Sequence, residues 1–201
     1  MKAVIFDFDG VIHDTLHDLH KIHCETLENL TLGDMKKKVF SGNSRKYFEK
    51  FTDEKKDSFE KAWSKHCETL TIDKSVKEEI EKLSRKYLIF IVSSNNEENI
   101  RNYFEKNCIS GLITAIYGAE TNYSKTEKFR LLLSQHRLNL KDCVFITDTL
   151  GDVTEANKVG IRTIAVDFGY HDREYLQKGK PFKIVSSFRE IREIIQKQLQ
   201  S

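Results

Sequence analysis

The stretch Ala3-Val4-Ile5-Phe6-Asp7-Phe8-Asp9-Gly10 decides the fold, because it joins an apolar run to two carboxylates and a glycine. Short runs of β-branched and aromatic residues are typical of strands that are buried on both faces. Side chains alternate along a strand, so we expect Asp7 and Asp9 on the same side, at its carboxyl end. Ligands of open parallel sheets bind beyond that end, and Gly10 lets the backbone turn closely past whatever binds there.

Further apolar runs predict a parallel sheet. With the first run they are 3–8, 87–92, 112–117, 143–147 and 161–166. Helical stretches lie between the later runs, at 75–86, 97–106, 125–136 and 151–158. Strands that alternate with helices make right-handed crossovers, which place helices on both faces. We therefore expect an α/β protein with a three-layer, Rossmann-like core.

Residues 14–73 break this alternation, because they contain no strand-like run. Apolar residues recur there at helical spacing instead, as at Leu16, Leu19, Ile22 and Leu30. The segment leaves after the first strand and returns before the second. We expect an all-helical cap of residues 14–73 inserted into an α/β core of residues 1–13 and 74–201.

Composition narrows the choice of partner. The 33 basic residues almost balance 31 acidic ones, so the net charge of +2 gives no general field for nucleic acid or an anionic membrane. No basic leader precedes the first strand and no apolar run is long enough to cross a membrane, so we expect a cytoplasmic protein. The partner predicted is a small molecule, and the chain is expected to be a monomer or a homodimer.

A second pair of acids follows the run 143–147. Asp148 and Asp152 should lie near Asp7 and Asp9, because neighbouring strand ends meet at one edge of the sheet. Four carboxylates repel one another unless protons or a cation neutralise them. Hard oxygen ligands suit Mg²⁺, so the sequence predicts a magnesium site.

Polar residues at two further strand ends are candidates for phosphate binding. Ser93 and Asn95 offer a hydroxyl and an amide just before a helix, although by themselves such residues more often form an ordinary helix cap. Lys125 opens the next helix, where the helix dipole disfavours a cation unless an anion lies nearby. Lys128, one turn later, is a rival for the same role.

Four motifs together resemble those of the haloacid dehalogenase superfamily: DFDGV at 7–11, IVSSN at 91–95, SK at 124–125 and FITDTLGD at 145–152. The segment 156–176 is similar to the branch of phosphoglycolate phosphatase and β-phosphoglucomutase, whose members have a small helical cap. The resemblance implies an aspartyl-phosphate on Asp7, with Asp9 as acid and base. It implies that Asp7, Asp148 and the backbone carbonyl of Asp9 hold Mg²⁺, with Asp152 in support. It also implies that Ser93, Asn95, Gly10 and Lys125 surround the phosphate.

The cap suggests where the rest of the substrate lies. The run 41–45 resembles a cap loop that reaches the active site in similar proteins, so Arg45 is a candidate contact for a carboxylate or phosphate. His13 stands where the family has an aliphatic residue. It is a second candidate substrate contact, or a partly buried histidine near the hinge of the cap.

The function predicted is a Mg²⁺-dependent phosphatase that hydrolyses a small phosphomonoester such as phosphoglycolate or a sugar phosphate. A sugar-phosphate mutase of the β-phosphoglucomutase type would share the same residues. A receiver-like switch phosphorylated on an aspartate is an alternative from another class, disfavoured by the paired acids and the long insertion. A true dehalogenase would lack an acid like Asp9.

Overall fold

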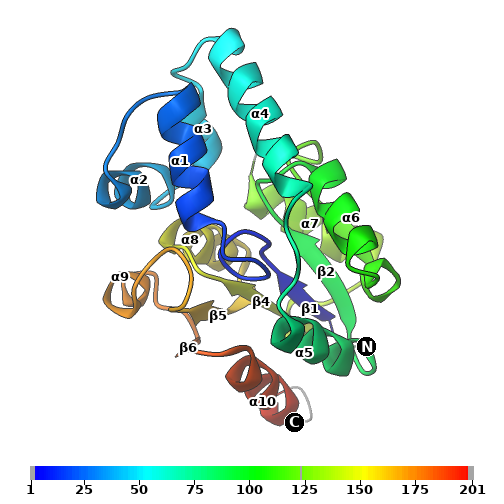
Figure 1. Ribbon diagram of the computed structural model, residues 1–201. Coiled ribbons are helices and arrows are strands. Elements are labelled where there is room, and N and C mark those ends of the chain that lie inside the picture. The colour runs from blue at the N-terminus through cyan, green and yellow to red at the C-terminus, as the bar shows by residue number, and fades with distance from the viewer. Residues whose placement is uncertain (1–2, 123, 199–201) are drawn as a thin grey trace.

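The computed structural model describes residues 3–122 and 124–198, and of Arg45 and Gln198 it describes the backbone alone. Its centre is a parallel sheet of six strands in the order β3-β2-β1-β4-β5-β6. The strands are β1 (Ala3–Phe6), β2 (Leu88–Val92), β3 (Ala115–Tyr117), β4 (Cys143–Thr147), β5 (Arg162–Val166) and β6 (Lys183–Val185). The predicted Rossmann-like α/β fold is confirmed (Figure 1).

Helices cover both faces of the sheet, because both faces are apolar. Val4 and Phe6 of β1 pack in one cluster with side chains of α5 (Lys74–Ser84), α6 (Glu97–Lys106) and α10 (Phe188–Gln198). Ala3 and Ile5 point the other way, into a cluster with α7 (Lys125–Gln135) and α8 (Leu150–Val159). A short helix, α9 (Arg173–Gln177), joins β5 to β6. These are the three layers that the buried strands predict.

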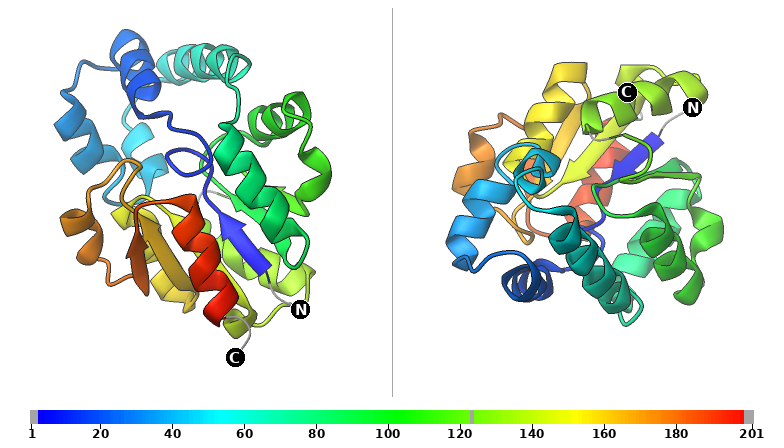
Figure 2. Two further views of the ribbon diagram at one scale, coloured as in Figure 1. Left: turned by 60° about the horizontal axis from the view of Figure 1, so that its bottom comes forward. Right: turned by 90° about the horizontal axis from the view of Figure 1, so that it is seen from above.

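The interval between β1 and α5 holds helices and their connections. They are α1 (Leu16–Thr26), α2 (Leu32–Val39), α3 (Ser44–Phe48) and α4 (Asp53–Cys67), and we call this group the cap. Threonine side chains begin two of them, since Thr31 and Thr52 accept hydrogen bonds from the N–H groups of Asp34 and Lys55. The cap lies over the carboxyl ends of the strands, as the views of Figure 1 and Figure 2 agree. Cap boundaries at 14 and 73 remain a prediction.

Strand register sets the place of the first acid. Phe6 pairs with Ile91 of β2 on one side and with Ile146 of β4 on the other. The Asp7 N–H then donates to the Ile146 carbonyl oxygen at 2.9 Å. Asp7 therefore leaves the sheet between the ends of β2 and β4, beside the residues that follow those two strands.

Some predicted boundaries are wrong. The first strand ends at Phe6 rather than Phe8, because the Phe8 carbonyl accepts from the N–H groups that follow and closes a turn. Asp9 therefore lies beyond the strand, and the alternation of side chains along a strand does not determine its direction. The predicted strand 112–117 begins only at Ala115, after a 3₁₀ turn, η1 (Ser110–Leu112). The elements β6, α9 and α10 were not predicted. For β6 the reason is its length, because it has only three residues and one of them is exposed.

None of the helices in the described part of the chain has the length and apolar character needed to cross a membrane.

Candidate active site

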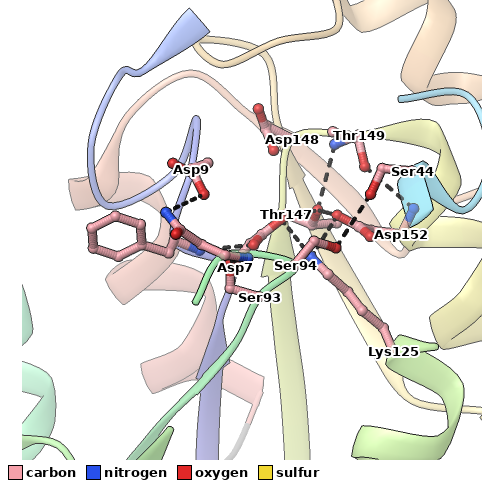
Figure 3. A network of polar contacts seen from close by, with 12 residues as sticks. Asp7, Asp9, Ser44, Ser93, Ser94, Lys125, Thr147, Asp148, Thr149 and Asp152 are labelled. Atoms are coloured by element: carbon pink, nitrogen blue, oxygen red, sulfur yellow. Dashed lines mark hydrogen bonds and ion pairs between the residues drawn. The ribbon is translucent and has the colours of Figure 1, made fainter. Parts of the chain in front are cut away.

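Asp7, Lys125 and Asp152 form a buried ion-pair network at the carboxyl end of β1. The Lys125 Nζ lies 2.7 Å from Asp7 Oδ2 and 2.8 Å from Asp152 Oδ2 (Figure 3). The side chains of Asp7 and Lys125 are only 7% and 4% exposed, so solvent screens these charges little. Sequence reasoning placed these residues at neighbouring strand ends, and the structure brings all three into direct contact.

Thr147, the last residue of β4, was not predicted to belong to this network. Its Oγ1 donates to Asp152 Oδ2 at 2.9 Å and lies 3.5 Å from Asp7 Oδ2. The Phe8 N–H donates to the other oxygen, Asp7 Oδ1, at 2.8 Å. Both oxygens of Asp7 are therefore fixed in orientation. The signal in the sequence was a threonine directly before Asp148, but a threonine in a strand is ordinary.

The network contains less positive than negative charge, since Lys125 faces three buried carboxylates. Burial raises the pKa of Asp7 well above its usual value, and Asp152 and Asp148 add to this although Lys125 opposes it. Burial likewise raises the pKa of Asp148 to about 8. Burial acts in the same sense on Asp152, but Lys125 and the hydrogen bonds with Asp7 and Thr149 together outweigh it and lower that pKa to about 2. A further cation would favour the ionised forms of Asp7 and Asp148.

Asp148 is the residue whose surroundings best fit a bound cation. It is fully buried; its Oδ2 accepts from the Tyr170 N–H at 2.7 Å, while its Oδ1 has no hydrogen-bond partner. A buried carboxylate oxygen without a partner is costly, and a metal ion is one way to satisfy it. Oxygen donors are also the ligands that Mg²⁺ prefers. Among the described residues no three His, Cys, Asp or Glu side chains are grouped to hold a metal. The predicted set instead combines Asp7, Asp148 and a backbone carbonyl, and it stays a prediction.

Gly10 makes room for Asp148. It has φ +75°, which a side chain disfavours, and a Cβ there would lie 1.9 Å from Asp148 Oδ2. Gly10 does not line the cavity described below, and its place beside a phosphate stays a prediction.

Asp9 lies next to the network and is held by two donors. Thr15 Oγ1 donates to its Oδ1 at 3.0 Å, and Asn95 Nδ2 donates to its Oδ2 at 3.1 Å. Tyr170 fixes Thr15 in turn, since their hydroxyl oxygens are 2.6 Å apart. Burial raises the pKa of Asp9 to about 6, although Thr15 and Asn95 both oppose the shift.

The two candidate lysines, Lys125 and Lys128, have different partners near the loop that follows β2. Ser93 is 1% exposed, and its Oγ accepts from the Asn95 N–H at 3.1 Å. Lys128 donates from Nζ to the Ser93 carbonyl at 2.5 Å, so it supports this loop from beneath. Lys125 is the lysine that reaches Asp7, and it lines the cavity together with Ser93 and Asn95.

The two candidate substrate contacts are His13 and Arg45, and the structure describes the side chain of His13 alone. His13 Nδ1 lies 3.2 Å from the Tyr103 hydroxyl, and His13 is not among the residues that line the cavity. The prediction of a substrate contact is unsupported there, because the turn after Gly10 directs this side chain towards α6. Arg45 belongs to α3, but its side chain lies outside the described part of the structure.

A cavity of about 680 Å³ lies between this site and the cap. Asp7, Asp9, Ser93, Lys125 and Asp152 form its core side. Its opposite side comes from all four cap helices and combines apolar residues with the polar residues Ser44, Lys56, Glu60 and Ser64. Those apolar residues are Leu19, Met35, Val39, Phe48, Phe59 and Trp63.

The loop between α2 and α3 contacts the core beside the site. The Gly151 N–H donates to the Phe40 carbonyl at 3.1 Å, and the rings of Phe40 and Tyr170 are 4.6 Å apart. Asn43 Nδ2 donates to Glu155 Oε1 at 2.9 Å, while Glu155 Oε2 accepts from the Lys125 N–H at 2.6 Å.

Glu155 therefore links the cap loop to the first residue of α7. Sequence reasoning missed Glu155 and Tyr170. It included Asn43 in the cap loop 41–45 but missed its contact with Glu155, since a contact across 112 positions leaves no local pattern.

Comparison with known proteins agrees with this geometry. The family model described as haloacid dehalogenase-like hydrolase matches residues 4–166. A phosphoglycolate phosphatase of Synechococcus elongatus is 26% identical over 98 residues, which are 49% of this chain and 46% of the relative. The match thus spans less than half the length of that relative.

Solved structures share the whole fold. A haloacid dehalogenase-like hydrolase of Streptococcus pneumoniae superposes with a TM-score of 0.80 at 17% identity, covering 97% of this chain and 98% of the other. A protein of Haemophilus somnus, named as a predicted phosphoglycolate phosphatase, gives 0.78 at 19% identity, covering 96% and 97%. At such identities the likeness shows the fold alone.

An acid-rich site at the carboxyl edge of a parallel sheet, closed by a helical cap, defines a hydrolase of the haloacid dehalogenase type. The chain belongs to the haloacid dehalogenase-like hydrolase family, whose model matches more than half of its length.

Proposed function

We propose that the protein is a Mg²⁺-dependent phosphatase that hydrolyses a small phosphomonoester through an aspartyl-phosphate on Asp7. The observation that carries the proposal is the position of Asp7, which lines the cavity while Lys125 Nζ lies 2.7 Å from its Oδ2. A carboxylate oriented by a cation and by backbone N–H donors is suited to act as a nucleophile. The phosphatase name of the relative from Synechococcus elongatus supports the same reaction class.

The site contains residues that could hold the metal ion. Asp7, Asp148 and the backbone carbonyl of Asp9 would hold Mg²⁺, and Asp152 would support it. The unpartnered Asp148 Oδ1 and the raised pKa values of Asp7 and Asp148 fit such a cation. When bound, the ion would neutralise charge on the phosphoryl oxygens and the carboxylates.

The first half of the reaction forms a bond between a carboxylate oxygen of Asp7 and phosphorus. The bond between phosphorus and the ester oxygen breaks, and Asp9 gives its proton to that leaving oxygen. Lys125 and Ser93 lie at the same end of the cavity and would hold the phosphoryl oxygens. Asn95 and Thr15 keep the Asp9 carboxyl in place beside Asp7.

The second half returns the enzyme to its starting state. Asp9, now a carboxylate, takes a proton from a water molecule whose oxygen attacks phosphorus. The bond between Asp7 and phosphorus breaks, and inorganic phosphate leaves. The cap would exclude water during the first half, since its loop contacts the core next to the site.

Phosphate release from a panel of esters tests the proposal, with Mg²⁺ and with chelator. Asp7→Asn is expected to stop turnover while leaving the fold intact. Asp142→Asn is a matched control, because Asp142 is half-buried and precedes β4 at the other end of the sheet. Mass spectrometry of acid-quenched enzyme should show one phosphoryl group in the wild type and in Asp142→Asn, but none in Asp7→Asn. Release by the Asp7→Asn protein at the wild-type rate would contradict the mechanism.

The product distinguishes the mutase alternative. A phosphatase releases inorganic phosphate, whereas a mutase passes the phosphoryl group from Asp7 to a second hydroxyl of a sugar phosphate. Isomerised sugar phosphate without phosphate release would favour the mutase.

A further inference from the structure

The cavity is large for the esters that the sequence suggests. Its volume of about 680 Å³ lies well inside the range of roughly 300–1,000 Å³ that is usual for ligands of drug size. The phosphoryl group would occupy only the end formed by Asp7, Lys125 and Ser93. A two-carbon acid attached to it would leave the cap side of the cavity empty.

The cap side offers an apolar surface. Phe48, Phe59 and Trp63 supply aromatic rings there, and Leu19, Met35 and Val39 complete this cap wall. Phe48 and Phe59 also pack on each other, with ring centroids 5.2 Å apart. An apolar group that covers the cap wall is favoured in proportion to the area it removes from water.

Charge in the cavity disfavours a second anionic group on the substrate. Lys125 is shared between Asp7 and Asp152, and it belongs to the phosphoryl end. The described lining has one other cation, Lys56, which lies 3.2 Å from Asp53. Glu60 and Glu120 also line the cavity. A substrate carboxylate would therefore meet two acids and a cation that already has an acidic partner.

We infer the substrate class from the apolar cap wall and from the charges that line the cavity. This inference rests on the phosphatase function proposed above. The substrate is a phosphate monoester of a ring-sized, largely apolar organic group that carries no second anionic charge. The ring packs on the cap wall while the phosphoryl group meets Asp7. This class excludes phosphoglycolate as the preferred substrate.

Three esters of primary alcohols test the inference with leaving groups of similar type. They are benzyl phosphate, glucose 6-phosphate and phosphoglycolate, and kcat/KM is measured for each with Mg²⁺. We expect kcat/KM for benzyl phosphate to exceed that for phosphoglycolate by at least about tenfold, with the polar hexose between them. A value for phosphoglycolate equal to or above that for benzyl phosphate would overturn the inference and leave the phosphatase proposal standing. No release from any ester would remove the phosphatase proposal itself.

A matched pair of variants locates the effect at the cap wall. Phe48 and Phe51 belong to one aromatic cluster in the cap and both are half-buried, but only Phe48 lines the cavity. Phe48→Ala is expected to lower kcat/KM for benzyl phosphate by about tenfold more than that for glucose 6-phosphate. Phe51→Ala should leave the ratio of the two values unchanged. Unfolding midpoints show that both variants are folded, and an equal change of the ratio in both would refute a role for the cap wall.

Discussion

The two sides of the cavity are built by opposite means. On the core side, buried charges and hydroxyls hold one another at 2.7–2.9 Å, as Lys125, Asp152 and Thr147 show. On the cap side, helices present rings and aliphatic chains, such as Phe48 and Trp63, which hold position by packing. A buried polar network tolerates little change, whereas an apolar wall can be reshaped if volume is kept. The difference suggests that the core side fixes the reaction and the cap side selects the substrate.

The largest expected effect lies on the core side. Lys125→Met removes the cation between Asp7 and Asp152, which leaves buried charge without compensation. We expect kcat to fall by about 10²–10³-fold and the free energy of unfolding to fall by roughly 3–5 kcal/mol. Phosphate release and urea denaturation measure the two effects.

Lys128→Met is the matched control for that change, one turn further along α7. It deletes the donor to the Ser93 carbonyl but leaves the ion pairs, so it should cost about 1–3 kcal/mol and much less activity. Equal losses of kcat in the two variants would show that Lys125 has no special role.

A second change tests the close approach of Gly10 to Asp148, in the loop that follows β1. Gly10→Ala would place a methyl group within 1.9 Å of Asp148 Oδ2 and 2.7 Å of the Tyr170 ring, at a positive φ. We expect a loss of about 2–4 kcal/mol in stability, together with weaker Mg²⁺ activation of phosphate release. Gly160→Ala shares the positive φ but meets nothing closer than 3.8 Å. It should cost only about 1 kcal/mol and leave Mg²⁺ dependence unchanged.

A smaller effect is expected where the cap loop contacts the core beside the cavity. Asn43→Ala removes the hydrogen bond from the cap loop to Glu155, which is worth about 1 kcal/mol. If the loop docks when substrate binds, KM should rise by roughly fivefold with kcat nearly constant. Asn29→Ala, at an exposed asparagine of the same cap, is the control and should change neither constant. A fall in kcat at constant KM would show instead that Glu155 acts through Lys125.

The smallest effect on activity concerns a region that forms neither side of the cavity. Glu79 lies between Lys82 at 2.7 Å and Arg192 at 2.5 Å, joining α5 to α10. Burial acts to raise its pKa, but the two cations outweigh burial and lower the pKa below the ordinary 4.5. Its contribution to stability is therefore present above pH 4.5 and is lost as pH falls through the lower folded-state pKa.

Glu79→Gln should accordingly cost about 1–2 kcal/mol near neutral pH and leave kcat/KM unchanged. Urea midpoints of the two proteins should converge in acid. A difference that grows as pH falls would mean that the ion pairs are not its source.

Much of the core side could be predicted because its signals are local. Asp7, Asp148 and Lys125 each follow a strand or open a helix, and parallel strands bring such positions to one edge. Thr147 and Glu155 could not be found in this way, because their partners lie on other elements. Register decides those contacts, and register is a property of the folded sheet.

The cap side was harder to predict. Helical spacing gave the helices, but it could not tell which apolar side chains fill the interior and which face a cavity. Phe40, for example, follows α2 of the cap, yet its ring packs on Tyr170 of the core. Phe48, Phe59 and Trp63 belong to a continuous apolar cluster and also line the cavity. Volume between elements depends on how whole helices are placed, which no short pattern encodes.

The position of Trp63 has a practical consequence. It is the single tryptophan of the chain, and it lies in the cap wall of the cavity. Indole emission responds to the water and the rings around it, so selective excitation of this side chain would follow one place in the molecule. The protein thus carries a natural fluorescent reporter, with which ligand entry can be followed in real time without a label and without turnover.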